Sequence, residues 1–315
     1  MKNNKTEILI NESSFKLRDK FITGPQLQMA YCEKREIDKY HTRSRLFYNF
    51  TPLLVNTGYI SIGKTLVTVY WISENEIVLI DSGEKERFDF LTELEERNIS
   101  VRAVINTHLH SDHTANNREL LKRFNAKFYA SIEEIRTTQI PEGMYTVIES
   151  EGVVNVDGVQ FKVMPTPGHT KGHLAIITPD NVCCLGDAVM TKRLIKASRM
   201  PYMVDVQQAF ESIKKIGKLK CPFFVISHRG VVPISKLTEV INLNMEKECE
   251  ILAELQKFVI SSIDFEELIT LFMREIGIER SSFLEDPYLR EATSARIYYL
   301  NQVGILKNKK GKVYL

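Results

Sequence analysis

The 315-residue sequence predicts a mixed α/β (α+β) fold followed by a helical tail. Short β-branched and aromatic runs alternate with amphipathic stretches up to about residue 233, and helical periodicity replaces them beyond it. Hydrophobic residues make up 43% of the chain and charged residues 26%, a composition typical of globular proteins. The formal net charge of +2 implies no chain-wide attraction to nucleic acid or acidic membranes, so such binding would need a local patch.

The predicted domain organisation has three parts. Residues 1–51 form a polar N-terminal extension, in which only a short helix around residues 25–40 is expected. Residues 52–233 hold most of the strand-like runs and form the main domain. Residues 234–315 form a smaller helical domain. A second domain is expected because a single core stops growing at roughly 250–300 residues, and this chain is longer.

The main domain alternates short strands with amphipathic helices. Turn residues bound most of its apolar runs, which is typical of strands. The expected strands are residues 66–72, 77–80, 101–105, 127–130, 159–164, 173–177, 182–185 and 223–226. The expected helices are residues 84–97, 114–124 and 206–218. Strands in unequal groups interrupted by helices favour sheets with helices on their outer faces.

The tail shows helical periodicity and ends in a hairpin pattern. Helices are expected at residues 235–259 and 285–302, with another that begins after Asp264 as its N-cap. Residues 306–315 place turn residues between two short strand-like runs. Three helices followed by a hairpin are typical of a winged helix, so a winged-helix-like domain is predicted.

The cysteine pattern and the apolar runs predict a cytoplasmic protein. Five cysteines occur at irregular spacing without a CxxC motif, which suits reduced thiols in a reducing compartment. The N-terminus has no apolar stretch typical of a signal peptide. No segment approaches the roughly 18 uninterrupted apolar residues of a membrane span, so no membrane partner is expected.

One segment carries a dense set of potential metal ligands. The apolar run 101–105 is followed within a few residues by His108, His110, Asp112 and His113. Alternate residues of an extended backbone face the same way, so His108 and His110 are expected to converge on one cation. Imidazole and carboxylate donors suit Zn²⁺ and competing ions such as Mn²⁺ and Fe²⁺. A polar loop with surface histidines is the alternative, and so many ligand types at one strand end disfavour it.

Three further ligand candidates lie where other apolar runs end. They are His169, Asp187 and His228. Functional groups on such scaffolds are commonly carried by the loops that follow strands. Pro165, Pro167 and Gly168 predict a tight turn that directs His169 back toward the sheet edge.

These residues resemble the complete signature of the metallo-β-lactamase superfamily. The resemblance spans roughly residues 52–232 and rests on His108-x-His110-x-Asp112-His113, His169, Asp187 and His228, with Asp81 in the family's first motif. It implies an αββα sandwich with a dinuclear metal site at one edge of the sheets.

The resemblance also implies a role for each of these residues. It implies that His108, His110 and His169 bind the first metal. Asp112, His113 and His228 are implied ligands of the second metal, and Asp187 is the implied bridge. Asp81 is expected to steady the ligand loop through hydrogen bonds.

The implied activity is metal-dependent hydrolysis. Two Zn²⁺ ions, with Mn²⁺ or Fe²⁺ as alternatives, would share a hydroxide that Asp112 orients toward an ester, thioester or phosphodiester bond. Glyoxalase-II-like thioesterases, lactonases and hydrolases of RNA or other phosphodiesters have similar ligands. A mononuclear iron persulfide dioxygenase is a related alternative that would not need all seven ligands.

The end of the chain allows a different class of function. Residues 290–315 carry a local charge of +5, because Glu291 is the only acid beside Arg290, Arg296, Lys307, Lys309, Lys310 and Lys312. Interleaved tyrosines would make this a surface for RNA or DNA, and the protein a ribonuclease or a nucleic-acid-binding regulator. The alternative is a basic turn exposed to solvent without a nucleic-acid partner, because runs of like charge are usually solvated surface. A cap over the active site and a homodimer contact are further alternatives for the tail.

Three other residues are candidates for contact with the small-molecule substrate. His173 lies four residues after His169. It would contact the substrate, support a metal ligand, or be an ordinary histidine at the start of a strand. Tyr202 lies between Asp187 and the next helix and is a candidate hydrogen-bond donor to a developing oxyanion. Arg229 follows His228 and would favour an anionic substrate if it points inward.

Overall fold

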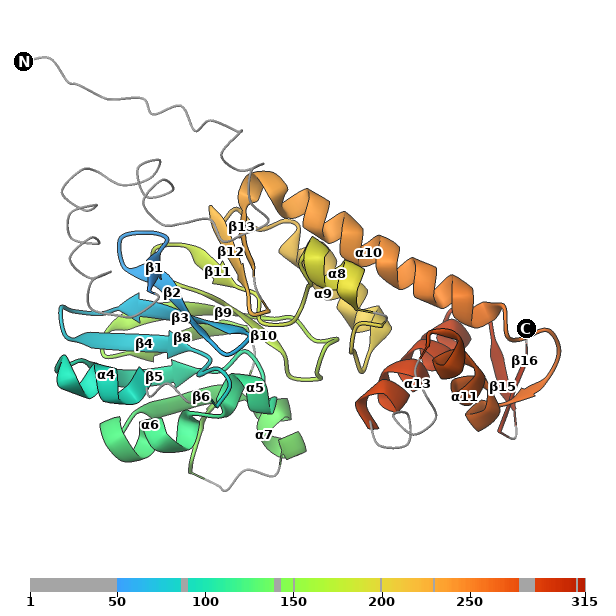
Figure 1. Cartoon of the computed structure of the whole chain (residues 1–315), viewed down its shortest axis with the longest axis horizontal. Coiled ribbons are helices and arrows are strands. Elements are labelled where there is room, and N and C mark those ends of the chain that lie inside the picture. The colour runs from blue at the N-terminus through green and yellow to red at the C-terminus, as the bar shows by residue number, and fades with distance from the viewer. Residues whose placement is uncertain are drawn as a thin grey trace, which may run out of the picture. The chain divides into compact units, whose positions relative to one another are not determined.

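A computed structural model describes residues 50–85, 90–138, 143–149, 151–198, 200–228, 230–277, 287–309 and 311–314 (Figure 1). Contacts divide the chain into two compact units. The first holds the described residues up to Met164, with Leu174–Gly186 and Cys221–Ile234. The second holds Pro165–His173, Asp187–Lys220 and the described residues from Ser235 onward. The helix expected around residues 25–40 lies outside the described residues.

The first unit contains a seven-stranded sheet whose strands follow chain order. Its strands are β1 (Thr51–Pro52), β2 (Thr57–Ile62), β3 (Thr65–Trp71), β4 (Glu76–Ile80), β5 (Ser100–Ile105), β6 (Lys127–Ser131) and β7 (Thr146–Ile148). The first four pair antiparallel, and β4 to β7 pair parallel. Parallel neighbours need crossover connections, and helices supply them. These helices are α4 (Phe90–Glu96), α5 (Ser111–Thr114), α6 (Asn117–Phe124) and α7 (Ile132–Thr138).

A six-stranded sheet completes the sandwich of the first unit. Its strands, in spatial order, are β13 (Gly230–Pro233), β12 (Phe223–Ile226), β11 (Val182–Cys184), β10 (Leu174–Ile177), β9 (Val159–Pro165) and β8 (Gly152–Val156). Tyr70 and Ile105 of the first sheet share one buried cluster with Phe161 and Ile176 of the second. That cluster is the core between the sheets, and the ligand candidates follow the strands that border it.

Helices α4 and α6 cover the outer face of the seven-stranded sheet. Leu94 of α4 and Leu120 of α6 are fully buried in one cluster with Trp71 and Phe128 from the strands. This arrangement follows from the amphipathic spacing of both helices, since each presents one apolar stripe to the sheet.

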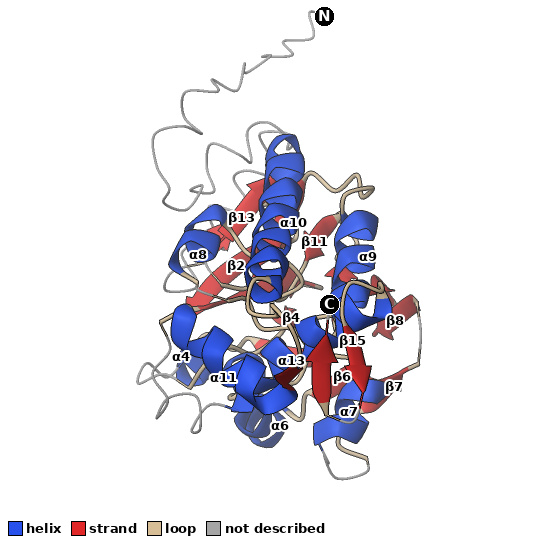
Figure 2. Cartoon of the chain, turned by 90° about the vertical axis from the view of Figure 1, so that its right-hand side faces the viewer, coloured by secondary structure: helices blue, strands red, loops and turns tan. Residues whose placement is uncertain are grey.

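The second unit is mostly helical. Its helices are α8 (Lys192–Ala197), α9 (Val206–Ile216), α10 (Ile234–Gln256, whose first residue belongs to the first unit), α11 (Phe265–Glu275) and α13 (Pro287–Gln302). A small antiparallel sheet of β14 (Ile263–Asp264), β16 (Lys312–Tyr314) and β15 (Lys307–Lys309) lies beside α11 and α13 (Figure 2). Phe210, Leu255, Phe272 and Leu300 belong to one buried cluster, so residues on both sides of position 234 share this core.

Most predicted elements are present, with several differences in extent. Of the helix expected at residues 84–97, the described part is α4, with residues 86–89 outside the described residues. The helix expected at 114–124 is divided into α5 and α6. Strands β1, β2, β7, β8, β13 and β14 and helices α7 and α8 were not predicted. Asp264 is confirmed as an N-cap, because its Oδ1 accepts hydrogen bonds from the backbone of Glu266 and Glu267. The tail hairpin is confirmed as β15 and β16, while the winged-helix assignment stays a prediction.

No helix within the described residues combines the length and apolar character needed to cross a bilayer.

Candidate metal centre

Asp81 organises the loop that carries the densest ligand motif. It follows β4 with a φ of 62°, a left-handed conformation uncommon for a residue other than glycine. Its Oδ1 accepts from the backbone N–H of Thr107, and its Oδ2 accepts from the Thr107 hydroxyl, both at 2.8 Å. Oδ2 also lies 2.8 Å from Nδ1 of His113. The strained residue therefore ties both ends of the loop after β5 to the end of β4.

The same contacts determine which ring nitrogens are available to a cation. The Asp81 carboxylate accepts hydrogen bonds, so the proton of His113 lies on Nδ1 and its Nε2 keeps a lone pair. The Thr107 hydroxyl donates to Asp81 and thus accepts from Nδ1 of His108, 3.1 Å away. His108 Nε2 lies 3.1 Å from His110 Nδ1. Two nitrogens that share a tetrahedral Zn²⁺ lie about 3.3 Å apart, so this pair fits a common cation.

Asp112 and His228 form a second part of the centre with His113. His228 follows β12, and its Nε2 lies 3.2 Å from Oδ2 of Asp112. The His113 and His228 rings meet edge to face with centroids 5.6 Å apart. The His113 side chain is fully buried, whereas Asp112 is 35% exposed. This part of the centre therefore has a protected base and a carboxylate at a solvent-facing rim.

His169 and Asp187 face each other within the second unit. His169 follows β9, and its Nδ1 lies 3.1 Å from the carbonyl oxygen of Tyr202. A carbonyl only accepts, so Nδ1 carries the proton, and Nε2 lies 3.6 Å from Oδ2 of Asp187. Gly168 before it has a φ of +139°, and a Cβ there would lie 2.5 Å from the Cα of Ala209. Only glycine fits this turn.

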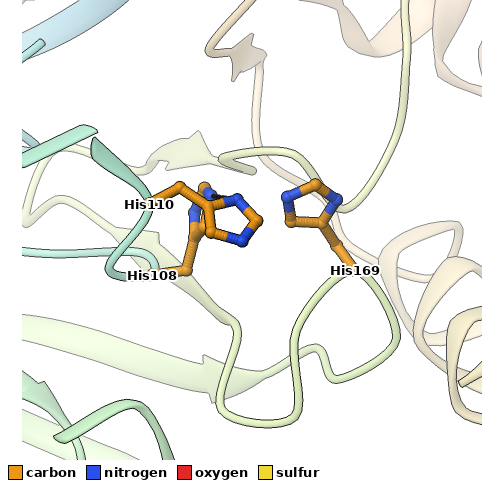
Figure 3. Close-up of side chains that lie close together, drawn as sticks. All are labelled: His108, His110 and His169. Atoms are coloured by element: carbon orange, nitrogen blue, oxygen red, sulfur yellow. Dashed lines mark hydrogen bonds between the residues drawn. The ribbon is translucent and has the colours of Figure 1, made fainter. Parts of the chain in front are cut away.

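All seven predicted ligands occur in groups whose donor atoms lie within 4.8 Å of one another. One group joins His108 and His110 with His169, and Figure 3 shows these imidazoles directed toward one another. The other two groups are His108, His113 and Asp187, and Asp112, His113 and His228. His108 and His113 each belong to two groups, so the three groups form one continuous set of donors.

The candidate substrate residues have different surroundings. His173 is fully buried, with Nδ1 2.8 Å from the Thr166 hydroxyl. Its Nε2 accepts from the backbone N–H of Asp187 at 3.1 Å, which favours a supporting role over substrate contact. The Tyr202 hydroxyl donates to Oε2 of Glu291 at 2.7 Å. Arg229 lies outside the described residues.

The structure adds a supporting residue that no sequence pattern indicated. Glu134 of α7 is 4% exposed, and its Oε2 accepts from the backbone N–H of Leu109 at 2.9 Å. Leu109 lies between His108 and His110, so this carboxylate fixes the segment that separates two ligands. Glu134 lies in a short helix that was not predicted, and no local motif distinguishes it from a surface glutamate.

A two-sheet α/β sandwich with imidazole and carboxylate groups gathered where its strands end is the arrangement of a metallohydrolase. A sequence model of the family described as the metallo-beta-lactamase superfamily matches residues 62–228, more than half of the chain. The chain belongs to the metallo-beta-lactamase superfamily.

Similar curated proteins are named as hydrolases. A probable metallo-hydrolase of Methanocaldococcus jannaschii is 34% identical over 165 residues, which are 51% of this chain and 74% of the relative. A hydroxyacylglutathione hydrolase of Prochlorococcus marinus is 28% identical over 227 residues, which are 68% of this chain and 88% of the relative. The chain is accordingly a hydrolase of this superfamily.

Solved structures confirm the predicted fold. A metallo-beta-lactamase family protein of Thermus thermophilus has a TM-score of 0.62 at 16% identity and covers 85% of this chain and 97% of its own. A beta-lactamase domain protein of Burkholderia ambifaria has a TM-score of 0.63 at 14% identity, covering 84% of this chain and 94% of its own. At these identities the likeness shows the fold alone.

Proposed function

We propose that the chain is a dinuclear metal hydrolase that cleaves an ester, thioester or phosphodiester bond, with a thioester as the foremost substrate class. The observation that carries this proposal is the continuous set of seven ligand atoms in three overlapping groups. A single cation would not need seven ligands, which disfavours a mononuclear iron dioxygenase.

The donor set fits divalent cations of the Zn²⁺ type. It consists of five imidazoles and two carboxylates, which also accept Mn²⁺ or Fe²⁺. His108, His110 and His169 would hold one ion, Asp112, His113 and His228 the other, and Asp187 would lie between them. Bound divalent cations supply a nucleophile at neutral pH and stabilise negative charge that develops on a substrate oxygen.

The chain's own residues would supply orientation and proton handling. Asp81 holds the proton of His113 on Nδ1 and so leaves Nε2 as the ring nitrogen that can bind a cation. Asp112 is the proposed catalytic residue, because its partly exposed carboxylate lies 3.9 Å from His113 Nε2 and close to His228. At this rim it can accept a proton from water that attacks the substrate.

The thioester preference is supported by the relatives named hydroxyacylglutathione hydrolases. Because of these names, we rank an acyl thioester of a small thiol first among the three substrate classes. The direct test is turnover of S-lactoylglutathione beside a lactone, bis-p-nitrophenyl phosphate and single-stranded RNA. We expect hydrolysis of the thioester, its loss in Asp112→Ala, and its retention in a Glu119→Ala surface control. Turnover of the phosphodiesters alone would contradict the thioester assignment.

The structure of the basic tail supports a nucleic-acid function less than the tail's charge does. Arg296 is fully buried in an ion pair with Glu248, so it is not available for the phosphate contact that a nucleic-acid surface would need. Arg290 is paired with Glu266. Lys307, Lys309 and Lys312 are exposed on the hairpin, and Lys310 lies outside the described residues. Nucleic-acid binding through this tail and a homodimer contact are expectations from the sequence alone.

We also propose a cytoplasmic location and keep residues 52–233 as the catalytic domain. Cys183, Cys184, Cys221 and Cys249, the cysteines within the described part of the chain, are all unpaired thiols. This state suits a reducing compartment.

A further inference from the structure

A buried ion pair in the second unit contacts the loop that packs against His169. Arg296 of α13 is 0% exposed and Glu248 of α10 is 3% exposed, with Nη2 2.6 Å from Oε2. Nη2 also donates to the carbonyl of Pro201 at 3.0 Å, and Nη1 donates to the carbonyl of Ala292 at 2.8 Å. A buried pair persists when such additional hydrogen bonds compensate for its loss of water. One of these bonds ends on the loop between α8 and α9 and not on a helix.

Tyr202, the next residue of that loop, is in direct contact with His169. Its carbonyl lies 3.1 Å from His169 Nδ1, and its ring meets the imidazole edge to face with centroids 5.3 Å apart. Helix α13 holds the same tyrosine from the other side. Glu291 accepts from its hydroxyl at 2.7 Å, and the Tyr288 ring lies 5.4 Å from its ring.

We propose that Arg296 and Tyr202 are positioning residues for His169. Arg296 fixes the peptide carbonyl before Tyr202, and Glu291 fixes the Tyr202 side chain. The carbonyl of Tyr202 then keeps the His169 proton on Nδ1 and leaves Nε2 as the metal-binding atom. The C-terminal helices are in this way part of the support of the metal centre. The inference rests on the proposed function for the metal role of His169, and all its contacts lie within the second unit.

The first test replaces both members of the ion pair. Arg296→Met with Glu248→Met keeps side-chain volume, leaves no unpaired buried charge and removes the bond to Pro201. Metal-free protein is titrated with Zn²⁺ in competition with a chromophoric chelator. We expect one of the two Zn²⁺ equivalents to bind about 2–10-fold more weakly, because the variant removes one hydrogen bond to the loop and leaves the Tyr202 carbonyl in place. The other equivalent should keep its affinity. Arg290→Met with Glu266→Met, an ion pair between α11 and α13, is the matched control.

The second test does not disturb the buried pair. Tyr202→Phe removes only the hydroxyl that reaches Glu291, so the same Zn²⁺ equivalent should bind roughly 2–10-fold more weakly. Glu291→Ala should weaken Zn²⁺ binding to the same extent, whereas Glu291→Gln, which keeps an acceptor oxygen, should bind Zn²⁺ like the wild type. The double variant Tyr202→Phe with Glu291→Ala should bind no more weakly than either single variant. Tyr298→Phe, an exposed tyrosine of the same helix, should bind like the wild type.

The two tests distinguish this inference from the proposed function. A wild-type protein that binds two equivalents of Zn²⁺, while Tyr202→Phe and the folded double variant bind both with unchanged affinity, would overturn the positioning role. If the double variant does not fold, unchanged binding by Tyr202→Phe and Glu291→Ala overturns it alone. A wild-type protein that binds no Zn²⁺ would overturn the proposed function and, with it, this inference.

Discussion

Asp81 accepts three close hydrogen bonds, two from Thr107 and one from His113, and it does so from a left-handed backbone conformation. Backbone strain of this kind costs of order 1–3 kcal/mol and persists where the surroundings determine it fully. The side chain is 1% exposed, so these bonds are not shared with bulk water. Asp81 therefore holds the loop that carries the ligands in place without being a predicted ligand itself.

Replacing Asp81 with Asn tests this role. An amide has one acceptor oxygen in place of two, so it cannot accept all three hydrogen bonds that Oδ1 and Oδ2 accept from Thr107 and His113. We expect Zn²⁺ affinity in a chelator competition to fall about 10–100-fold. Asp157→Asn is the control, because that carboxylate is bound to Arg102 at the surface. Equal affinities in the two variants would contradict the account.

The cysteines give a second test at the scale of single residues. Burial raises the pKa of Cys184 to about 12, and a hydrogen bond with Cys221 together with burial raises that of Cys183 well above its usual range. A raised thiol pKa means less thiolate at pH 8, and only the thiolate is alkylated. In a Cys32→Ser background, iodoacetamide at pH 8 should modify exposed Cys249 in the native protein and all four described cysteines after unfolding. Mass spectrometry identifies the modified cysteines. Rapid modification of Cys184 in the native protein would contradict its burial in β11.

At the scale of elements, the turn between β9 and β10 depends on Gly168. Its positive φ and the 2.5 Å approach to the Ala209 Cα leave no room for a side chain, so Gly168→Ala must displace either this turn or α9. We expect an unfolding free energy lower by about 2 kcal/mol or more in urea titrations, with weaker Zn²⁺ binding because His169 moves.

Gly158→Ala is the matched control for that change. Gly158 also has a positive φ, of +90°, but its Cβ position is open. It should lose only about 1 kcal/mol of stability, from the backbone conformation alone, and bind Zn²⁺ like the wild type. Equal effects of both substitutions on metal binding would contradict the steric explanation.

The elements and the candidate ligands were predictable from the sequence to different degrees. The ligands were accessible because each follows an apolar run, as His108 follows β5 and His228 follows β12. Strand β2 was missed because Gly58 interrupts its pattern, and α7 because it is one short helix among charged residues. The contacts of Glu134 and Arg296 were inaccessible because their partners are distant in sequence, with Glu248 separated from Arg296 by 48 positions.

At the scale of the whole molecule, RNA binding by the basic end of the tail is the property that separates a hydrolase from a nucleic-acid-binding protein. Two of its arginines are paired with carboxylates, so we expect no salt-sensitive binding of single-stranded RNA in fluorescence anisotropy. Lys307→Glu with Lys309→Glu should leave thioester turnover unchanged. Submicromolar RNA binding that weakens with salt and disappears in this variant would instead support the ribonuclease or regulator alternatives.

The central claim is that one continuous set of seven ligands holds two catalytic metal ions. The most direct measurement is metal content per chain beside thioester turnover, for the wild type and for His113→Ala. The account predicts two equivalents in the wild type, loss of turnover on chelation with recovery on added Zn²⁺, and a folded but inactive His113→Ala. Full turnover by metal-free protein or by His113→Ala would contradict it.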